Sequence, residues 1–166
     1  MSEYNQESKD RFSNIVKESL QEEMSSAETT KEKGDMFLIW AVSRLIDASK
    51  DEIREQITDG KDDMGIDAWI KPEIATENGG GTIQLFQSKY GSSHDDKEIL
   101  KFENQIKIFL TCPLEKIPRD DMKKLRITID KEKLEPELYY VTDQTIKNKI
   151  EINKIKIIGF EDIVDT

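Results

Sequence analysis

The sequence has very few of the residues that build disulfides and zinc sites. Cys112 and His94 are the only cysteine and the only histidine among its 166 residues. A single cysteine excludes a disulfide within the chain and fits the reducing cytoplasm. One cysteine and one histidine are also too few for a zinc site made by this chain alone. We expect Cys112 to be a small apolar residue at a helix end, with no evident base partner, and His94 to be exposed.

Long apolar runs and an excess of basic residues are lacking as well. No run of about 18 apolar residues is present, so no membrane-spanning segment is expected, and the polar segment 1–10 does not resemble a signal peptide. The net charge of −10 is unlike that of a generic nucleic-acid binder, whose surface is usually basic. It does not exclude a nuclease, because acidic ligands can need a divalent metal before phosphate approaches. We expect one soluble, cytoplasmic domain.

Apolar residues recur at helical spacing in four segments, which predicts helices over 9–23, 35–48, 50–56 and 96–111. The charged segment 114–137 leaves two alternatives open, a helix near 119–126 or a short strand at 125–129. Further strands are predicted at 138–142 and 154–159, with a short helix at 145–149 and a closing turn or helix at 160–164. A strand, a helix and a strand in this order favour a parallel crossover, and so a mixed sheet with helices on both faces.

A β-hairpin is predicted around the glycine run Gly79-Gly80-Gly81, with strands at 65–72 and 82–90. Glycine takes positive φ at no steric cost, so the chain can reverse there. Before the first strand, Asp62 and Asp63 are expected in a turn, because aspartate hydrogen-bonds to nearby backbone.

Polar side chains meet on one face of this hairpin. Alternation along the second strand places Gln87 and Lys89 on the same face as Leu85, and a suitable register brings Asp67 beside them. Asp67 is expected inside a strand, where aspartate is disfavoured, which favours a functional interpretation. A carboxylate and an amide oxygen can hold Mg²⁺, which keeps several waters, while a lysine stabilises developing negative charge. The patch therefore suits phosphodiester chemistry.

The motifs Gly65-Ile66-Asp67-Ala68 and Gln87-Ser88-Lys89 resemble the core of the PD-(D/E)XK, or restriction-endonuclease-like, nuclease superfamily, in the variant with glutamine in place of the second acid. The longer strings Ile57 to Trp69 and Gln84 to Tyr90 resemble the N-terminal domain of abortive-infection phage-resistance (AIPR) proteins. The similarity extends from about Phe37 to about Gly159. It implies an α/β/α sandwich with a central mixed sheet, formed by a nuclease-like domain at 34–166 behind a polar helical extension at 1–33.

The resemblance also implies a function and a site. Asp67 would bind Mg²⁺ or Mn²⁺, Gln87 would ligate through its amide oxygen, and Lys89 would stabilise the transition state of nucleic-acid cleavage, with DNA favoured over RNA, in bacterial defence against phage. Related nucleases often carry a glutamate in the early helix, soon after an aromatic residue, but here Leu38 follows Phe37. Asp35 is the nearest candidate for that ligand, and its other interpretation is an N-cap or first-turn acid.

Two other functions stay open. The domain can be an inactive nuclease-like module that binds nucleic acid or protein, as the neutral Gln87, the missing helix glutamate and the net charge of −10 suggest. It can also be an α/β domain unrelated to nucleic acid, with Asp67 and Lys89 as a structural ion pair. The proteins it resembles commonly continue beyond the nuclease-like domain, so a C-terminal region is an expected partner, and a homodimer stays open too.

Overall fold

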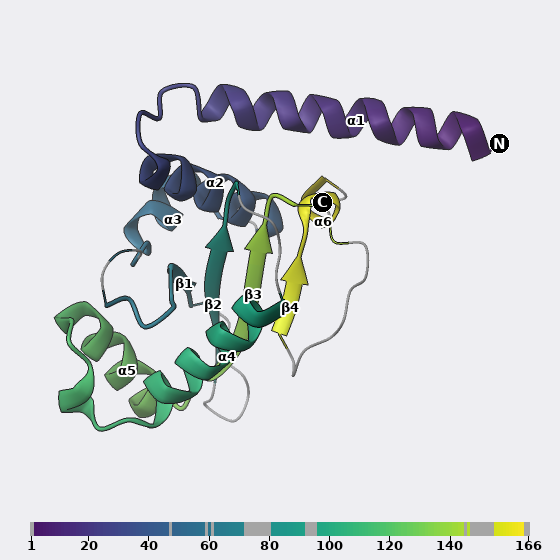
Figure 1. Ribbon diagram of the computed structural model, residues 1–166. Coiled ribbons are helices and arrows are strands. Elements are labelled where there is room, and N and C mark those ends of the chain that lie inside the picture. Colours follow the sequence, from purple (N-terminus) through teal and green to yellow (C-terminus); the bar gives the residue numbers. More distant parts are fainter. Residues whose placement is uncertain are drawn as a thin grey trace.

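The computed structural model describes residues 2–46, 48–58, 60, 62–71, 81–91, 96–144, 146 and 155–164 (Figure 1). Helices and strands mix along the described chain. The helices are α1 (Ser2–Glu23), α2 (Thr30–Leu45), α3 (Lys50–Glu55), α4 (Asp96–Thr111), α5 (Asp120–Glu132) and α6 (Phe160–Val164), with a short 3₁₀ helix at Leu114–Lys116. The strands are β1 (Ala68–Ile70), β2 (Thr82–Lys89), β3 (Glu135–Thr142) and β4 (Ile155–Ile158).

The four strands form one mixed sheet in the order β1-β2-β3-β4. β1 pairs antiparallel with β2, and Trp69 lies opposite Leu85. β3 lies parallel to both β2 and β4, with Lys89 opposite Thr142 in the β2–β3 pair. An isolated antiparallel bridge between Ile57 and Ala68 extends the ladder beyond β1. The expected hairpin and the mixed sheet are therefore confirmed, and the carboxyl ends of three parallel strands meet at one edge.

One face of the sheet is covered by α1, α2 and α6. Apolar side chains from these helices pack on Ala68, Phe86 and Val141 in a first core cluster. α2 supplies the central part, because six consecutive residues from Phe37 to Val42 are buried. Figure 1 shows α2 behind the tips of the strands, while α1 continues well beyond the rest of the molecule.

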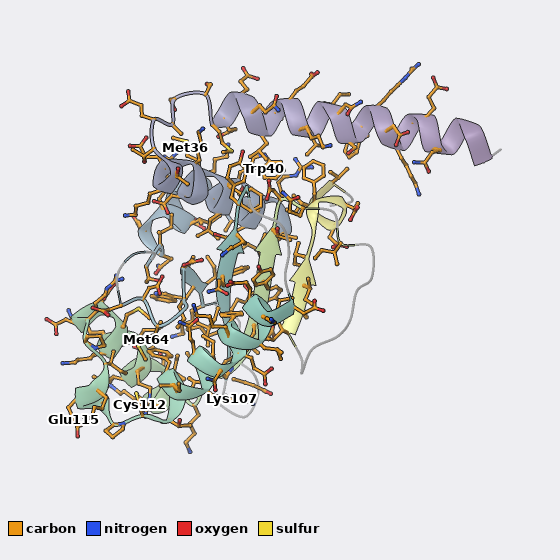
Figure 2. All side chains as sticks on the ribbon, in the orientation of Figure 1. Met36, Trp40, Met64, Lys107, Cys112 and Glu115 are labelled. Atoms are coloured by element: carbon orange, nitrogen blue, oxygen red, sulfur yellow. The ribbon has the colours of Figure 1, made fainter. Side chains whose placement is uncertain are left out.

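The other face is covered by α4 and α5, which pack on Ile83, Leu85 and Tyr140 in a second core cluster. α4 carries apolar residues at a spacing of three and four, and its buried positions include Phe102 and Phe109. In Figure 1, α4 passes in front of the strands. The side chains that fill both faces are drawn in Figure 2, with Trp40 labelled in the first cluster and Met64 packed against the second.

Local capping decides where two of the helices begin. The Thr29 side chain accepts a hydrogen bond from the backbone N–H of Glu32, so Thr29 is the N-cap of α2. The expected start at Asp35 is therefore wrong, and Asp35 lies in the second turn. Ser49 caps α3 in the same way through the N–H of Glu52.

The alternative left open for 114–137 is resolved in favour of a helix. Met122, Leu125 and Ile129 of α5 are buried in the second cluster, whereas Ile127 is 47% exposed. These positions follow a helical period rather than a period of two. α6 likewise resolves the closing segment as a helix.

Some expectations fall outside the described residues. They are the reversal at Gly79 and Gly80, the environment of His94, and the helix at 145–149 except for Ile146. Within the described part of the chain, no helix is long and apolar enough to cross a membrane.

Candidate functional site at the carboxyl end of β2

Asp67 lies directly before β1 and is 8% exposed. Its backbone N–H donates to the Phe86 carbonyl at 2.8 Å, and its carbonyl accepts from the Thr58 N–H at 2.8 Å. Its carboxylate Oδ2 accepts from the backbone N–H of Ser88 at 2.8 Å. The Asp67 carboxylate is thus held against the backbone of Ser88, between Gln87 and Lys89.

The strand expected at 65–72 is shorter in the structure, and Asp67 is not inside it. The regular β1–β2 ladder ends at Ala68. The Asp67 N–H still donates to the Phe86 carbonyl, and the carbonyl of Ile66 accepts from the Thr58 hydroxyl. The carboxylate of Asp67 satisfies the Ser88 N–H at the point where the ladder ends. This charge-assisted hydrogen bond gives the buried aspartate a structural role, because an unpaired N–H there would be costly.

Gln87 lies on β2 between Phe86, the partner of Ala68 at the end of the β1–β2 ladder, and Ser88, whose N–H donates to the Asp67 carboxylate. Alternation places its side chain on the α4 face, together with Leu85. Its amide oxygen Oε1 is buried and has no hydrogen-bond donor among the residues that the structure describes. A buried acceptor without a donor is uncommon and points to a bound water or ion.

Lys89 is the last residue of β2, and its ammonium lies 3.7 Å from Oε2 of Glu98. Both side chains are a little more than a third exposed, so this pair is weak and can rearrange. The sequence analysis did not single out Glu98. Only the position of Glu98 in the sequence could have pointed to it. The first turn of a helix that follows a strand returns over the carboxyl end of that strand.

The loop before β1 forms the turn expected at Asp62 and Asp63. Oδ1 of Asp63 accepts from the N–H of Gly65 at 2.9 Å, which is an aspartate turn. Gly65 has φ of +83°, where an L side chain is strained. A Cβ at this position would also lie 2.6 Å from Oε1 of Gln105 on α4. Gly65 thus lets α4 approach the segment that leads into Asp67.

Asp35 and Cys112 have different surroundings. Asp35 belongs to α2, whose buried residues pack on Ala68 and Phe86, on the face opposite Gln87. Cys112 directly follows α4, is partly buried and packs against the second cluster. The expectation of a small apolar residue at a helix end is confirmed for Cys112.

A metal ion needs suitable donor side chains close together. Among the described residues, there is no group of three or more Asp, Glu, His or Cys side chains that could hold a metal ion. Mg²⁺ does not require such a cage, since one or two carboxylates with several waters are common. The Asp67 carboxylate, bonded to the N–H of the residue after Gln87, and the buried Gln87 oxygen are donors of the kind that this smaller requirement needs.

A groove of about 430 Å³ lies at the same edge of the sheet, toward α1. Tyr90 and Asp143, which directly follow β2 and β3, line it together with Lys17 and Phe160. Burial raises the pKa of the Tyr90 hydroxyl above its usual value of 10.0, and the nearby Asp143 carboxylate raises this pKa further. Tyr90 is therefore a neutral hydrogen-bonding group at physiological pH.

Comparison with known proteins found no family model that matches this sequence, no matching curated protein and no matching solved structure.

Proposed function

We propose that this chain is a metal-dependent nuclease-like domain of the PD-(D/E)XK type, similar to the N-terminal domain of AIPR proteins, that cleaves phosphodiester bonds. The observation that carries the proposal is the Ser88 N–H to Asp67 hydrogen bond. It holds a carboxylate against the backbone of Ser88, between Gln87 and Lys89, which supports a site made of an acid, an amide oxygen and an ammonium at the carboxyl end of a strand. Ligands commonly bind at such an edge in α/β sheets.

Each residue has a distinct part in this proposal. The Asp67 carboxylate and the Gln87 Oε1 would hold Mg²⁺ or Mn²⁺, with water completing the shell. When bound, the metal supplies a water of lowered pKa and polarises the phosphate. Lys89 places a positive charge where the phosphate gains negative charge. Glu98 keeps Lys89 near this position while the site is empty of substrate.

The proposal includes the setting implied by the resemblance. DNA is favoured over RNA as the substrate, the role is bacterial defence against phage, and the compartment is the cytoplasm. An α/β/α sandwich of the restriction-endonuclease type is supported by a mixed sheet with one apolar cluster on each face.

The testing experiment is a cleavage assay on plasmid, linear and single-stranded DNA and on RNA, with Mg²⁺, Mn²⁺ or EDTA. The wild-type chain is compared with Lys89→Met, which keeps the length of the side chain and removes its charge. The control is Lys107→Met, since Lys107 is a mostly exposed lysine of α4 that pairs with Glu103. We expect metal-dependent cleavage that falls by about 10²-fold or more in Lys89→Met and persists in the control. Equal cleavage by both variants would reject the role of Lys89.

A second candidate is a nuclease-like module that binds nucleic acid or protein without cleaving. The structural role of the Asp67 carboxylate and the pairing of Lys89 with Glu98 favour it, because both groups have uses in the absence of catalysis. Mn²⁺ titration separates the candidates. An inert module binds Mn²⁺ equally before and after Asp67→Asn, whereas the nuclease loses Mn²⁺ affinity in this variant.

A further inference from the structure

Gln105 is a polar residue on the buried side of α4. Its amide oxygen Oε1 is buried and has no hydrogen-bond donor among the described residues. A Cβ added at position 65 would lie only 2.6 Å from this oxygen. The oxygen therefore packs directly against the backbone of Gly65. Asp67 follows two residues later. Neither the motif Gly65-Ile66-Asp67-Ala68 nor the motif Gln87-Ser88-Lys89 includes Gln105.

Gln105 and Gln87 lie on the same side of the sheet and share an unusual feature. Both bury an amide oxygen without a donor in the described part of the chain. Gln87 directly precedes Ser88, whose N–H donates to Asp67, and Gln105 of α4 packs against Gly65, two residues before Asp67. Buried acceptors are nearly always satisfied by a donor, a water or an ion. Two such oxygens, one on the residue before Ser88 and one against Gly65, together with the Asp67 carboxylate, suit a hydrated cation.

The course of α4 supports this arrangement. Glu98 and Gln105 are seven residues apart, which is close to two helical turns, so they project from the same side of α4. Glu98 reaches Lys89, and Gln105 reaches Gly65. The side of α4 that carries them therefore spans the whole polar patch, from the end of β2 to the turn before β1.

We propose that Gln105 is a further member of the metal site, which binds the hydrated Mg²⁺ or Mn²⁺ ion through its Oε1 together with Gln87 and Asp67. This inference rests on the proposed function, since it adds a residue to the same site. The positive φ of Gly65 already favours glycine there, and a Cβ at this position would in addition displace the Gln105 oxygen.

The experiment measures Mn²⁺ affinity of the full chain by electron paramagnetic resonance, and thermal unfolding with and without Mn²⁺. The test variant is Gln105→Met, which keeps the length of the side chain and lacks the oxygen. The matched control is Asn104→Met, a neighbouring exposed position on α4. Gln105→Glu restores an oxygen and adds a charge, and Asp67→Asn tests the site as a whole.

We expect Gln105→Met to weaken Mn²⁺ binding by about 10-fold or more, as is typical for residues around a metal. Asn104→Met should bind as wild type, and Gln105→Glu at least as tightly. Without metal, Gln105→Met should unfold no earlier than wild type, because it removes a buried acceptor that has no donor. A merely structural Gln105 would instead lower the metal-free unfolding temperature and leave Mn²⁺ affinity unchanged.

Two other results are distinguishable. Wild-type Mn²⁺ affinity in Gln105→Met, with loss of binding in Asp67→Asn, would overturn the role of Gln105 and leave the proposed function standing. Mn²⁺ affinity that Asp67→Asn leaves unchanged would overturn the proposed metal site, and this inference with it.

Discussion

The two faces of the sheet are covered by helices in the same way but differ in what they bury. On the α2 face, Phe86 and Val141 are fully buried in the first cluster, and the polar Gln84 of the same face is partly exposed. The α4 face begins equally apolar at Ile83 and Leu85 but becomes polar at Gln87 and Lys89, toward the carboxyl end of β2.

The residues on the two faces therefore contribute to different properties of the protein. On the α2 face, side chains contribute mainly the free energy of folding, through removal of apolar area from water and close packing. At the end of the α4 face, buried polar atoms are retained although an apolar residue would avoid their desolvation cost. Such exceptions to local rules are expected at functional sites. The predictions below test whether stability and function separate between the two faces.

The largest expected effect is on stability, at the α2 face. Phe37 is fully buried, and its ring contacts Trp40 and Tyr90 with centroid separations of 6.3 and 5.3 Å. Phe37→Ala should lower the free energy of unfolding by about 3–5 kcal/mol, because it removes buried apolar area and leaves a cavity. Urea denaturation measures this loss. Phe12→Ala, at a 48% exposed position of α1, is the control and should change stability little. A loss below about 1 kcal/mol at Phe37 would contradict the interpretation of this face as the stabilising one.

The second effect is on activity, at the end of the α4 face. Asp67→Asn keeps an oxygen that can accept from the Ser88 N–H but removes the charge. Cleavage should fall by about 10²-fold or more with the fold retained. Asp67→Ala should lose activity too, and about 1–3 kcal/mol of stability, because the Ser88 N–H then has no acceptor. Cleavage and circular dichroism of both variants separate the two roles. Full activity in Asp67→Asn would remove this residue from the site.

The third effect concerns Gln87. In Gln87→Glu a second carboxylate faces Asp67, which should tighten Mn²⁺ binding by about 10-fold and lower stability in EDTA through like-charge repulsion. Gln84→Glu is the matched control, since Gln84 is a partly exposed residue of β2 on the other face. Thermal unfolding in EDTA and in Mn²⁺ measures both changes. Equal changes of the unfolding temperature in Gln87→Glu and Gln84→Glu, both in EDTA and in Mn²⁺, would show that a charge at position 87 does not act through Asp67.

The smallest effect is a pH dependence at the edge between the two faces. The pKa of Tyr90 is raised in the folded chain, by burial and by Asp143. Above pH 10 the unfolded chain therefore loses this proton before the folded chain does. The free energy of unfolding should accordingly fall as the pH rises through this range. In Tyr90→Phe the free energy of unfolding, measured by urea denaturation, should fall less steeply between pH 9 and 11. An unchanged slope would contradict the raised pKa.

Comparison of the sequence with the structure shows where local patterns were sufficient. The helix at 96–111 was predicted from apolar spacing, and the antiparallel pairing of the segment after Asp67 with β2 followed from strand alternation and the glycine run. The segment 119–129 was ambiguous, because Leu125, Ile127 and Ile129 also alternate like a strand. Packing against the second cluster resolved it as a helix by burying Leu125 and Ile129 and exposing Ile127.

Glu98 and Gln105 were missed because their signals are weak in the sequence. Each is an ordinary polar residue of an amphipathic helix, and only the path of α4 across β2 brings Glu98 to Lys89 and Gln105 to Gly65. The one local sign is that Gln105 occupies an inward position, three residues after the buried Phe102 and four before the buried Phe109.

The sequence by itself determined the identity of most elements and the pairing of β1 with β2, because side-chain periodicity and glycine placement are local properties. The tertiary structure decided that Asp67 stands outside the strand and closes its ladder, and which residues of α4 reach the polar patch. Contacts between segments distant along the chain decide these features, because burial and hydrogen-bond satisfaction depend on the packed neighbours rather than on the local sequence.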